Sequence, residues 1–467
     1  VLTKGASEII LKRSNGIKFG DKVKILEEEK KNELKAKIDS YSSNGYRILS
    51  FGYKIVTDQQ ENNDLAREEL ENGLNYLGFV CIFDPPRNGV NNSVRKCLDA
   101  GITPVMITGD AVKTAESVAR EIGIINCKED LVLPGTAAHQ IDTETFNRVK
   151  VFARVSPKDK QKIVERYQEQ KRVVAMTGDG VNDALALSMA DAGVAMGITG
   201  TDVSKQASDL VVTDDSFNSI VTGIREGRAL YQRIRVMVFF FICVNLAEAI
   251  VYIGTSFIPG FALLDMAQRV YIFGIAHTLP PLALIIDRIP NNIMDKEPID
   301  GEGIFTKKLA IALVATSLSL SMVIYTIYFA TFWGLVPVNE INLLFFQPEF
   351  REEVFNYLRP DSWNQVKART MMHTILYIAI PFIVLSIRRF DKSIIRAIKE
   401  DSWWFTYLGI FSIWFIHAGL MYLPFLQTIP SAVGFHLDII GLSMTDWIVC
   451  IIGGLIPVGM LELVKRK

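Results

Sequence analysis

The stretch MTGDGVNDALAL, residues 176–187, decides the fold of this chain. It follows an apolar run, so it places Thr-Gly-Asp-Gly at the end of a predicted strand and a helix directly after it. Gly178 and Gly180 let the backbone turn tightly and approach an anion, and carboxylates such as Asp179 and Asp183 are ligands that Mg²⁺ prefers. A plain strand–turn–helix with an Asp cap would explain Gly-Asp alone. All twelve residues together indicate a magnesium-dependent phosphate site.

Around this stretch, short β-rich runs alternate with helical stretches of about 10–15 residues, a rhythm typical of a parallel sheet flanked by helices. The predicted strands cover 77–83, 103–108, 151–155, 172–177, 192–197 and 209–213. Residues 1–75 differ, since two charge-rich helical segments (27–39 and 61–72) flank one predicted strand at 46–56. In parallel sheets ligands bind beyond the carboxyl ends of the strands, so further site residues are expected there.

Two more strand ends carry polar residues of the expected kind. Thr108, Gly109 and Asp110 end one strand and could bind phosphate oxygens at the following helix N-terminus, although a simple N-capped helix is the alternative. Lys160, in ARVSPKDK (153–160), could neutralise a transferring phosphoryl group or could be a solvated surface lysine. If the three strand ends converge, they form a phosphoryl-transfer site with Mg²⁺.

A fourth segment, Asp84-Pro85-Pro86-Arg87, follows the strand at 77–83. Its two prolines force a rigid, non-helical exit, and Arg87 could reach a nucleotide or a carboxylate. The attacking group of such a site is missing, because the chain contains no Asp-Lys-Thr-Gly-Thr sequence. The sequence therefore supplies the supporting half of an active site without its nucleophile.

Composition divides the chain into a soluble and a membrane part. The 467 residues hold 50 Lys and Arg against 51 Asp and Glu, a balance that argues against a nucleic-acid partner. The five cysteines are scattered, which excludes a disulfide scaffold and a zinc site. Polar and apolar residues mix up to position 235, and from Val236 long apolar runs alternate with short charged loops. This pattern predicts an all-α transmembrane bundle over 236–467.

Six segments of the second part are long and apolar enough to cross a bilayer, for which about 20 residues suffice. The predicted spans are 236–258, 266–287, 309–335, 369–387, 403–424 and 445–463. Leu279-Pro280-Pro281 should kink or unwind the second one. Basic residues precede the first span and occupy alternate loops and the last residues. The soluble half and both ends of the chain are therefore expected on the cytoplasmic side.

On these motifs the chain resembles the C-terminal portion of a P-type ATPase, close to the calcium-pump and sodium-pump branch. KGASE (4–8) resembles the KGAPE motif of the family's nucleotide domain, and IMDKEP (293–298) resembles the stretch after its sixth span. DPPR, ITGD, ARVSPKDK and MTGDGVNDALAL match its phosphorylation domain. The resemblance implies a remnant of the nucleotide domain over 1–75 and a haloacid-dehalogenase-like, Rossmann-like phosphorylation domain with stalk over 76–235. Six helices over 236–467 would correspond to spans five to ten.

The resemblance also implies ATP and Mg²⁺ as cofactors and an aspartyl-phosphate intermediate. The acceptor Asp would belong to a preceding part of the same pump, so this chain alone is not expected to phosphorylate itself. Asp179 would bind Mg²⁺. The residues expected to contact nucleotide are Lys4, Arg47 and Arg87, the last as a bridge between domains. Those expected around the transferred phosphate are Thr108, Gly109, Asp110, Lys160, Asn182 and Asp183.

Polar residues inside membrane spans are candidates for the transport site, because they are costly in lipid. Asn245, Glu248 and Thr255 are three and seven residues apart and share one helical face. Glu248 aligns with a coordinating Glu of calcium and sodium pumps, although a protonated structural carboxyl is the alternative. His277 in the second span could pair with Glu248 or bind a transition metal, or could simply pack through a hydrogen bond.

The spans also depart from the family. Phe273, Ala276 and His277 stand where calcium pumps carry Asn and then Thr-Asp, and Ile380 stands where they carry Glu. A calcium site of six to eight oxygens cannot be built from what remains. The stretch TLPPLALIIDR (278–288) somewhat resembles lipid flippases. A cation-translocating ATPase is the favoured hypothesis, ahead of a pump with a lipid cargo and an inactive or regulatory relative.

Overall fold

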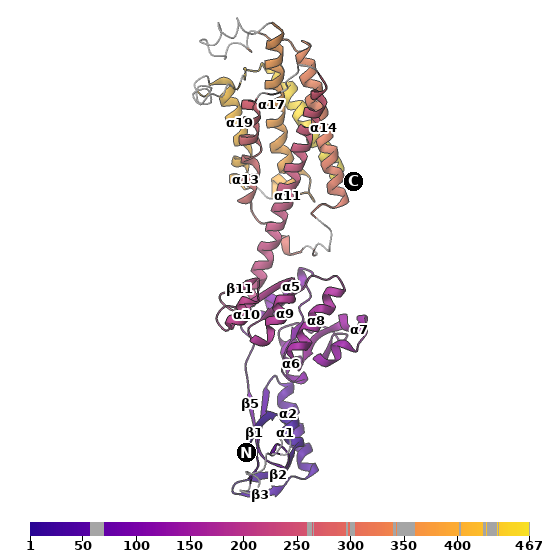
Figure 1. Ribbon diagram of the computed structural model, residues 1–467, viewed down its shortest axis with the longest axis vertical. Coiled ribbons are helices and arrows are strands. Elements are labelled where there is room, and N and C mark those ends of the chain that lie inside the picture. Colours follow the sequence, from indigo (N-terminus) through magenta and orange to yellow (C-terminus); the bar gives the residue numbers. More distant parts are fainter. Residues whose placement is uncertain are drawn as a thin grey trace. The chain divides into compact units, whose positions relative to one another are not determined.

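The computed structural model describes residues 1–56, 70–258, 264, 266–295, 298, 304–339, 342, 360–400, 403–423, 426, 437 and 439–466. The chain divides into two compact units. The first comprises residues 1–225 with 294–301, and the second comprises 226–293 with 302–467. Each is described by itself (Figure 1).

In the first unit, residues 1–56 and 70–82 contain a mostly antiparallel sheet with the strand order β1-β4-β5-β2-β3. Its strands are β1 (Leu2–Ala6), β2 (Ser14–Phe19), β3 (Lys22–Ile25), β4 (Arg47–Tyr53) and β5 (Leu74–Ile82). The helices α1 (Ser7–Lys12) and α2 (Glu28–Ser43) accompany them. Leu74 and Tyr76, both almost fully buried, belong to the apolar core between helices and sheet. The predicted strand at 46–56 and helix at 27–39 are confirmed, whereas most of the predicted helix at 61–72 lies outside the described residues.

The placement of the strand expected at 77–83 was wrong. This segment forms part of β5, which pairs antiparallel with β4 from Arg47↔Ile82 to Tyr53↔Asn75 and so belongs to the first sheet, not to the parallel one. The physical reason is exposure. Val80, Cys81 and Ile82 are all exposed, and neighbouring strand residues point to opposite faces, so neither face is covered at this end of β5. The central strand of a parallel sheet is covered on both faces. The rigid segment 84–87 thus leaves the first sheet.

The rest of the first unit is α/β. Its strands form two three-stranded parallel sheets, in the orders β6-β8-β7 and β11-β10-β9. The strands are β6 (Met106–Ile107), β7 (Leu131–Pro134), β8 (Val149–Ala153), β9 (Ala175–Gly178), β10 (Ala192–Met196) and β11 (Leu210–Val212). The helices are α5 (Val90–Asp99), α6 (Val112–Glu121), α7 (Thr143–Arg148), α8 (Pro157–Glu169), α9 (Ala184–Met189) and α10 (Asp202–Gln206), with 3₁₀ turns η1 (Gly135–His139) and η2 (Val181–Asp183).

The single parallel sheet expected from the sequence is thus present as two halves. Within the described residues, β6 and β9 each have one hydrogen-bonded neighbour and are edge strands of their sheets. Ile107, on β6, packs both on the apolar cluster around Phe152 and on the cluster around Met176 of β9. The two half-sheets therefore share side-chain contacts without sharing a hydrogen-bond ladder.

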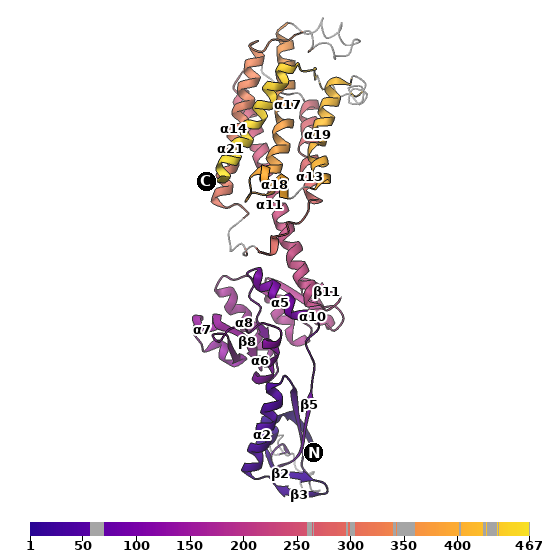
Figure 2. The same ribbon diagram turned by 180° about the vertical axis from the view of Figure 1, so that it is seen from behind.

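The second unit is helical. Its elements are α11 (Phe217–Ser256, which begins in the first unit), α12 (Met266–Tyr271), the π-helical turn η3 (Ile272–Ala276), α13 (Leu279–Ile285), α14 (Lys307–Phe332), α17 (Pro360–Arg388), α18 (Ile394–Glu400), α19 (Trp404–Tyr422) and α21 (Met444–Arg466). The 3₁₀ turn η4 (Ile293–Asp295) follows α13. Helices α14, α17 and α21 pack against one another (Figure 2). Gly454 permits this closeness, because a Cβ there would lie 2.7 Å from Ile378 Cγ2.

Five helices among the described residues are long and apolar enough to cross a membrane: α11, α14, α17 from Trp363, α19 and α21. The remaining predicted span is the second one, 266–287. It is present as α12, η3 and α13, and the α-helix is interrupted just before Pro280 and Pro281. Pro280 and Pro281 lie in the first turn of α13, where their missing N–H groups would have no partner within the helix. They also disfavour helical backbone in the residue before each of them. The predicted break is confirmed. Loop 259–263 and most of loops 336–368 and 425–444 lie outside the described residues.

Candidate functional sites

The end of β9 positions Asp179 through its backbone. The Asp179 carbonyl accepts hydrogen bonds from Thr201 N at 2.9 Å and Ser204 Oγ at 3.0 Å, and its side chain is exposed. Gly178 is required here, because a Cβ at this position would lie 2.5 Å from Asp183 Cβ. The strand end therefore holds a fixed backbone and leaves one carboxylate directed to solvent.

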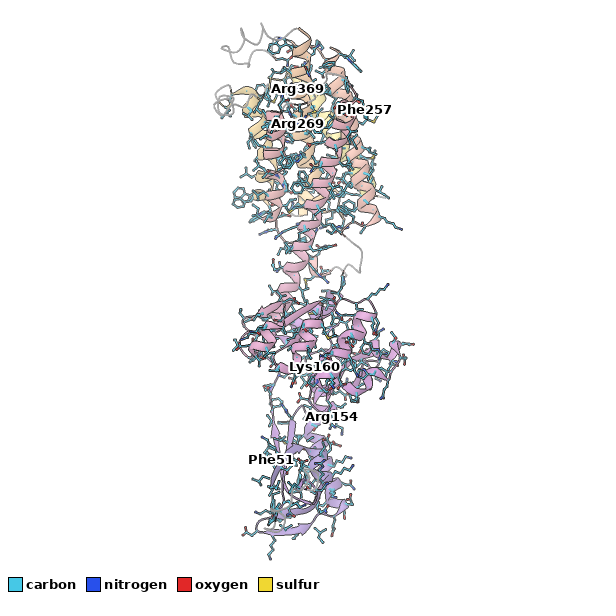
Figure 3. All side chains as sticks on the ribbon, in the orientation of Figure 1. Phe51, Arg154, Lys160, Phe257, Arg269 and Arg369 are labelled. Atoms are coloured by element: carbon cyan, nitrogen blue, oxygen red, sulfur yellow. The ribbon has the colours of Figure 1, made fainter. Side chains whose placement is uncertain are left out.

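Lys160 and Asp183 form an ion pair beside this strand end. Helix α8 begins with a capping box, in which Ser156 and Asp159 bond each other's backbone N–H, and Lys160 lies in its first turn. Lys160 Nζ pairs with Asp183 Oδ1, and Gly180 N donates to Asp183 Oδ2 at 3.2 Å. Asp183 is only 5 % exposed, so its carboxylate interacts with Lys160 and with the backbone N–H of Gly180 and little with solvent. Asn182 is exposed next to it. Figure 3 labels Lys160 and Arg154, which both follow β8.

The second predicted strand end, after β6, is arranged by local bonds. Thr108 N donates to Phe152 O, and Thr108 Oγ1 donates to Asp110 Oδ2 at 3.0 Å. Gly109 is exposed. Arg47 Nε, predicted to contact nucleotide, lies 3.6 Å from Asp110 Oδ1. The contacts of Ile107 bring this strand end near the end of β9, yet no described hydrogen bond or ion pair joins Asp110 to Lys160 or Asp179.

Lys4 and Arg47 lie on one face of the first sheet. Lys4 is exposed and pairs across the ladder with Phe51, and Phe51 and Arg47 are four residues apart on β4. Side chains of paired residues, and of residues an even number apart, share a face. Arg87 lies elsewhere, since its Nη1 donates to the Asp215 carbonyl at 2.6 Å. The three predicted nucleotide contacts are thus a pair on the sheet and a separate arginine on the α/β part.

Asp215, which the sequence reasoning did not single out, organises the segment that accepts the hydrogen bond of Arg87. It follows β11, has φ of 51°, and its carboxylate accepts bonds from Ile198 N, Thr199 N and Thr199 Oγ1 at 2.8–2.9 Å. These donors, Ile198 N foremost, lower the pKa of Asp215 to about 2. The available signal was the Asp-Asp pair directly after the predicted strand at 209–213.

The exposed carboxylate of Asp179 suits an Mg²⁺ ion that is also bound by phosphate oxygens. Mg²⁺ keeps several waters and binds through one or two carboxylates together with substrate phosphates. No cluster of three His, Cys, Asp or Glu able to hold a metal occurs among the described residues. The exposed carboxylate of Asp179, beside the lysine at Asp183, agrees with such a partial ligand set.

In the second unit, Glu248 and His277 form a pair. His277 Nε2 lies 3.0 Å from Glu248 Oε1, with side-chain exposures of 2 % and 17 %. The break before α13 positions the histidine, whose N–H bonds Ile272 O in the π-helical pattern. The other ring nitrogen, Nδ1, is buried and has no hydrogen-bond partner within the described part of the chain. The Nδ1 atom of His277 therefore has the capacity to bind a ligand or a proton.

The remaining transport-site candidates do not join this pair. Asn245 is exposed and its Nδ2 donates to Phe241 O at 2.7 Å, while Thr255 Oγ1 donates to Val251 O at 2.9 Å, one turn back on the same helix. Ala276 and Ile380, which stand where calcium-pump ligands were expected from the resemblance, are buried and apolar. Of the four predicted transport-site residues, the structure brings together Glu248 and His277.

The bundle also buries polar groups that the sequence reasoning did not single out. Tyr271 OH lies 2.8 Å from His417 Nδ1, and Thr374 Oγ1 lies 2.9 Å from His417 Nε2. Lys367 Nζ pairs with Asp446 Oδ1 at 2.9 Å, both side chains being no more than 2 % exposed. Their sequence signal was a charge or histidine inside a predicted span or at its edge.

Comparison with known proteins identifies the family to which the chain belongs. The family model described as "Cation transporting ATPase, C-terminus" matches residues 263–466, and the one described as "P-type ATPase, cytoplasmic domain N" matches residues 1–89. A "Calcium-transporting ATPase" of Bacillus subtilis is 36 % identical over 320 residues, which cover 68 % of this chain and 36 % of that protein.

Two further relatives extend the match. A "Probable cation-transporting P-type ATPase" of Mycoplasma genitalium is 33 % identical over 73 % of this chain and 39 % of its own length. The "Endoplasmic reticulum calcium ATPase srcA" of Aspergillus fumigatus is 31 % identical over 96 % of this chain and 47 % of its own length. The chain belongs to the P-type ATPase family and is a multi-pass membrane protein. It spans about a third to a half of the length of these relatives.

Proposed function

We propose that this chain forms the supporting half of the catalytic site and the transport site of a P-type ATPase. The complete pump would couple ATP hydrolysis, through an aspartyl phosphate, to the movement of a cation across a membrane. The observation that carries the proposal is the Lys160–Asp183 ion pair beside the exposed carboxylate of Asp179 at a parallel strand end. Mg²⁺ held by Asp179 would neutralise phosphate charge, and Lys160 would contact the transferred group.

The division of the parallel sheet into two halves suggests where the acceptor carboxylate would lie. Because β6 and β9 are edge strands whose residues meet in one apolar cluster, a further parallel strand between them would complete a single haloacid-dehalogenase-like sheet. Its end would emerge between Thr108 and Asp179. The acceptor Asp belongs on this strand, which a segment outside the present sequence would supply.

Transport is assigned to the Glu248–His277 pair, with the soluble unit on the cytoplasmic side. Glu248 is a part-buried carboxylate bonded to His277 Nε2, and the Nδ1 of this histidine has no hydrogen-bond partner within the described part of the chain. Such a pair suits a cation or a proton and is too small a polar site for a lipid headgroup. The relatives named above as calcium-transporting give calcium as the first ion to test. The apolar Ala276 and Ile380 argue against a calcium site of six to eight oxygens in these spans.

The test uses the complete product of the gene that encodes this sequence, purified and given radiolabelled ATP with Mg²⁺. An acid-stable, hydroxylamine-sensitive phosphoprotein whose turnover rises with an added cation supports the proposal. Turnover stimulated by phospholipid and not by any cation would favour a lipid pump, and absence of phosphoprotein would favour an inactive relative. Either of these outcomes contradicts cation transport.

A further inference from the structure

A short strap, residues 197–201, connects β10 to α10 and contacts the end of β9. At the last residue of the strap, Thr201 N donates to the Asp179 carbonyl at 2.9 Å. Ser204 Oγ, in the first turn of α10, donates to the same carbonyl at 3.0 Å. The backbone of Asp179 is therefore anchored by this segment, so the groups that hold the strap also influence where the Asp179 carboxylate lies.

The strap packs closely on backbone at two of its residues. Gly197 N donates to Val212 O on β11 at 2.8 Å, and a Cβ at Gly197 would lie 2.7 Å from the same oxygen. A Cβ at Gly200 would overlap the Met196 carbonyl oxygen. Both positions therefore require glycine, which lets two stretches of backbone approach. The two residues between these glycines are exposed, so packing alone does not fix them.

Asp215 supplies the anchor for these two residues. Its Oδ1 accepts a hydrogen bond from Ile198 N at 2.9 Å, and its Oδ2 accepts bonds from Thr199 N and Thr199 Oγ1, both at 2.8 Å. Asp215 is 7 % exposed, so water competes little for these bonds. Hydrogen bonds to an ionised carboxylate are roughly twice as strong as bonds between neutral groups. One buried charge thus holds the middle of the strap.

The backbone of Asp215 is itself held by a second contact. Arg87 Nη1 donates to the Asp215 carbonyl at 2.6 Å. Asp215 has a φ of 51°, a left-handed conformation that is costly for a residue with a side chain and persists where the surrounding contacts hold it. Asp215 therefore connects the segment 84–87 with the strap and, through the strap, with Asp179.

We propose that Asp215 is a positioning residue for Asp179, on which it acts through the strap. The proposal rests on the proposed function, in which Asp179 binds Mg²⁺. No hydrogen bond or ion pair among the described residues joins Asp215 directly to Asp179 or Lys160, so its influence passes through residues 197–201. Loosening the strap lowers the fraction of molecules in which Asp179 is placed to bind the ion. The apparent Mg²⁺ affinity falls by that fraction, whereas saturating Mg²⁺ restores the arrangement.

The first test is the Mg²⁺ dependence of phosphoenzyme formation in the complete product of the gene, measured with radiolabelled ATP. Asp215→Asn replaces one acceptor oxygen by an NH₂ group that faces N–H donors. The Mg²⁺ concentration for the half-maximal rate should rise about tenfold, the order expected for weakened bonds to a charged group. The rate at saturating Mg²⁺ should stay within about twofold of that of the unmodified pump.

Asp214→Asn is the matched control. Asp214 is the exposed neighbour whose carboxylate bonds Ser216 N and Ser219 Oγ at the start of α11. Asparagine serves a helix start as well as aspartate does, so the Mg²⁺ requirement should not change. Ser204→Ala removes one bond to the Asp179 carbonyl and should raise the half-maximal Mg²⁺ concentration about 2–10-fold. This variant tests the other end of the path even if Asp215→Asn does not fold.

The second test needs no activity and measures amide hydrogen exchange in the purified 467-residue chain. Asp215→Asn should increase the exchange rate in peptides covering 197–201 and also in peptides covering 176–183, because the end of β9 loses part of its anchor. Asp214→Asn should change neither set. Faster exchange confined to 197–201 would overturn the proposal, since the strap would then loosen without affecting the end of β9.

Two kinetic outcomes would also overturn it. One is an unchanged Mg²⁺ requirement in Asp215→Asn and Ser204→Ala. The other is a lower saturating rate with an unchanged Mg²⁺ requirement, which indicates general structural damage. If the unmodified pump forms no phosphoenzyme, the proposed function fails, and the exchange measurement still decides whether Asp215 holds the end of β9.

Discussion

The acidic residues of the two candidate sites have opposite surroundings. Asp179 is exposed, and the protein bonds its backbone carbonyl twice while leaving its carboxylate to solvent. Glu248 lies in a membrane helix, where the protein itself supplies a partner in His277 at 3.0 Å. Water solvates the first carboxylate until a ligand arrives, whereas hydrocarbon offers no such solvation. At Asp179 the protein therefore holds the backbone and leaves the carboxylate to solvent. At Glu248 it supplies the partner of the carboxylate itself.

Removing the charge of Asp179 should have the largest effect. Asp179→Asn in the complete pump should lower the rate of phosphoenzyme formation by on the order of 10³-fold or more, because an amide is a poor ligand for a hard cation that supplies several kcal/mol. The measurement is incorporation of radiolabelled phosphate at fixed ATP and Mg²⁺. Asp99→Asn, at an exposed position of α5, is the control. Near-normal phosphoenzyme in Asp179→Asn would remove this residue from the site.

Lys160 tests whether the ion pair serves catalysis. Lys160→Ala should slow phosphorylation by about 10²–10³-fold, the usual cost of one preorganised electrostatic contact. Lys162→Ala, exposed on the same helix α8, should leave the rate unchanged. Single-turnover rates at saturating ATP make the comparison. If Lys160→Ala lowers the phosphorylation rate by less than about threefold, the lysine is only a structural partner of Asp183.

The membrane pair should respond more moderately and in a different assay. Glu248→Gln should reduce cation-stimulated ATPase activity by about tenfold or more, because the replacement keeps the shape and removes the charge that a cation requires. His277→Ala should also reduce it, and Ser256→Ala, at the exposed end of α11, should not. Micromolar Ca²⁺ should not be the activating ion. Tight Ca²⁺ stimulation that survives Glu248→Gln would place the cargo site in other spans.

The stability contributed by Asp215, a carboxylate of the first unit, should depend on pH. Its pKa is lowered to about 2, so its bonds to Ile198 and Thr199 stabilise the first unit fully above the unfolded-state pKa near 4. This stabilisation is lost as pH falls from about 4 toward 2. Asp215→Asn should therefore lower the urea midpoint at pH 6, and the gap to the unmodified chain should close near pH 2. A gap of the same size at both pH values would contradict this origin.

The sequence by itself determined the class of each part, because local patterns carry that information. Glycine and aspartate at a strand end, as in 176–187, require a tight turn whatever surrounds them, and long apolar runs require a membrane. The interruption of the second span was also predicted from its two consecutive prolines, Pro280 and Pro281. The single prolines Pro381 and Pro457 lie inside the continuous helices α17 and α21. Five of the six parallel strands were found from their short apolar runs. The strand β7 at 131–134 and the division into two sheets were not predicted.

Only the tertiary structure decided which residues meet. The run at 77–83 is apolar enough for either sheet, and its pairing with β4 rests on contacts from residues 22–35 positions away. Three polar residues on one predicted face of α11 gave one paired carboxylate, because the break before α13 presents His277 to Glu248 alone. Arg233 and Arg388 line one cavity of the second unit although they are about 155 residues apart in the chain. Proximity of this kind depends on packing between distant segments, which no local pattern encodes.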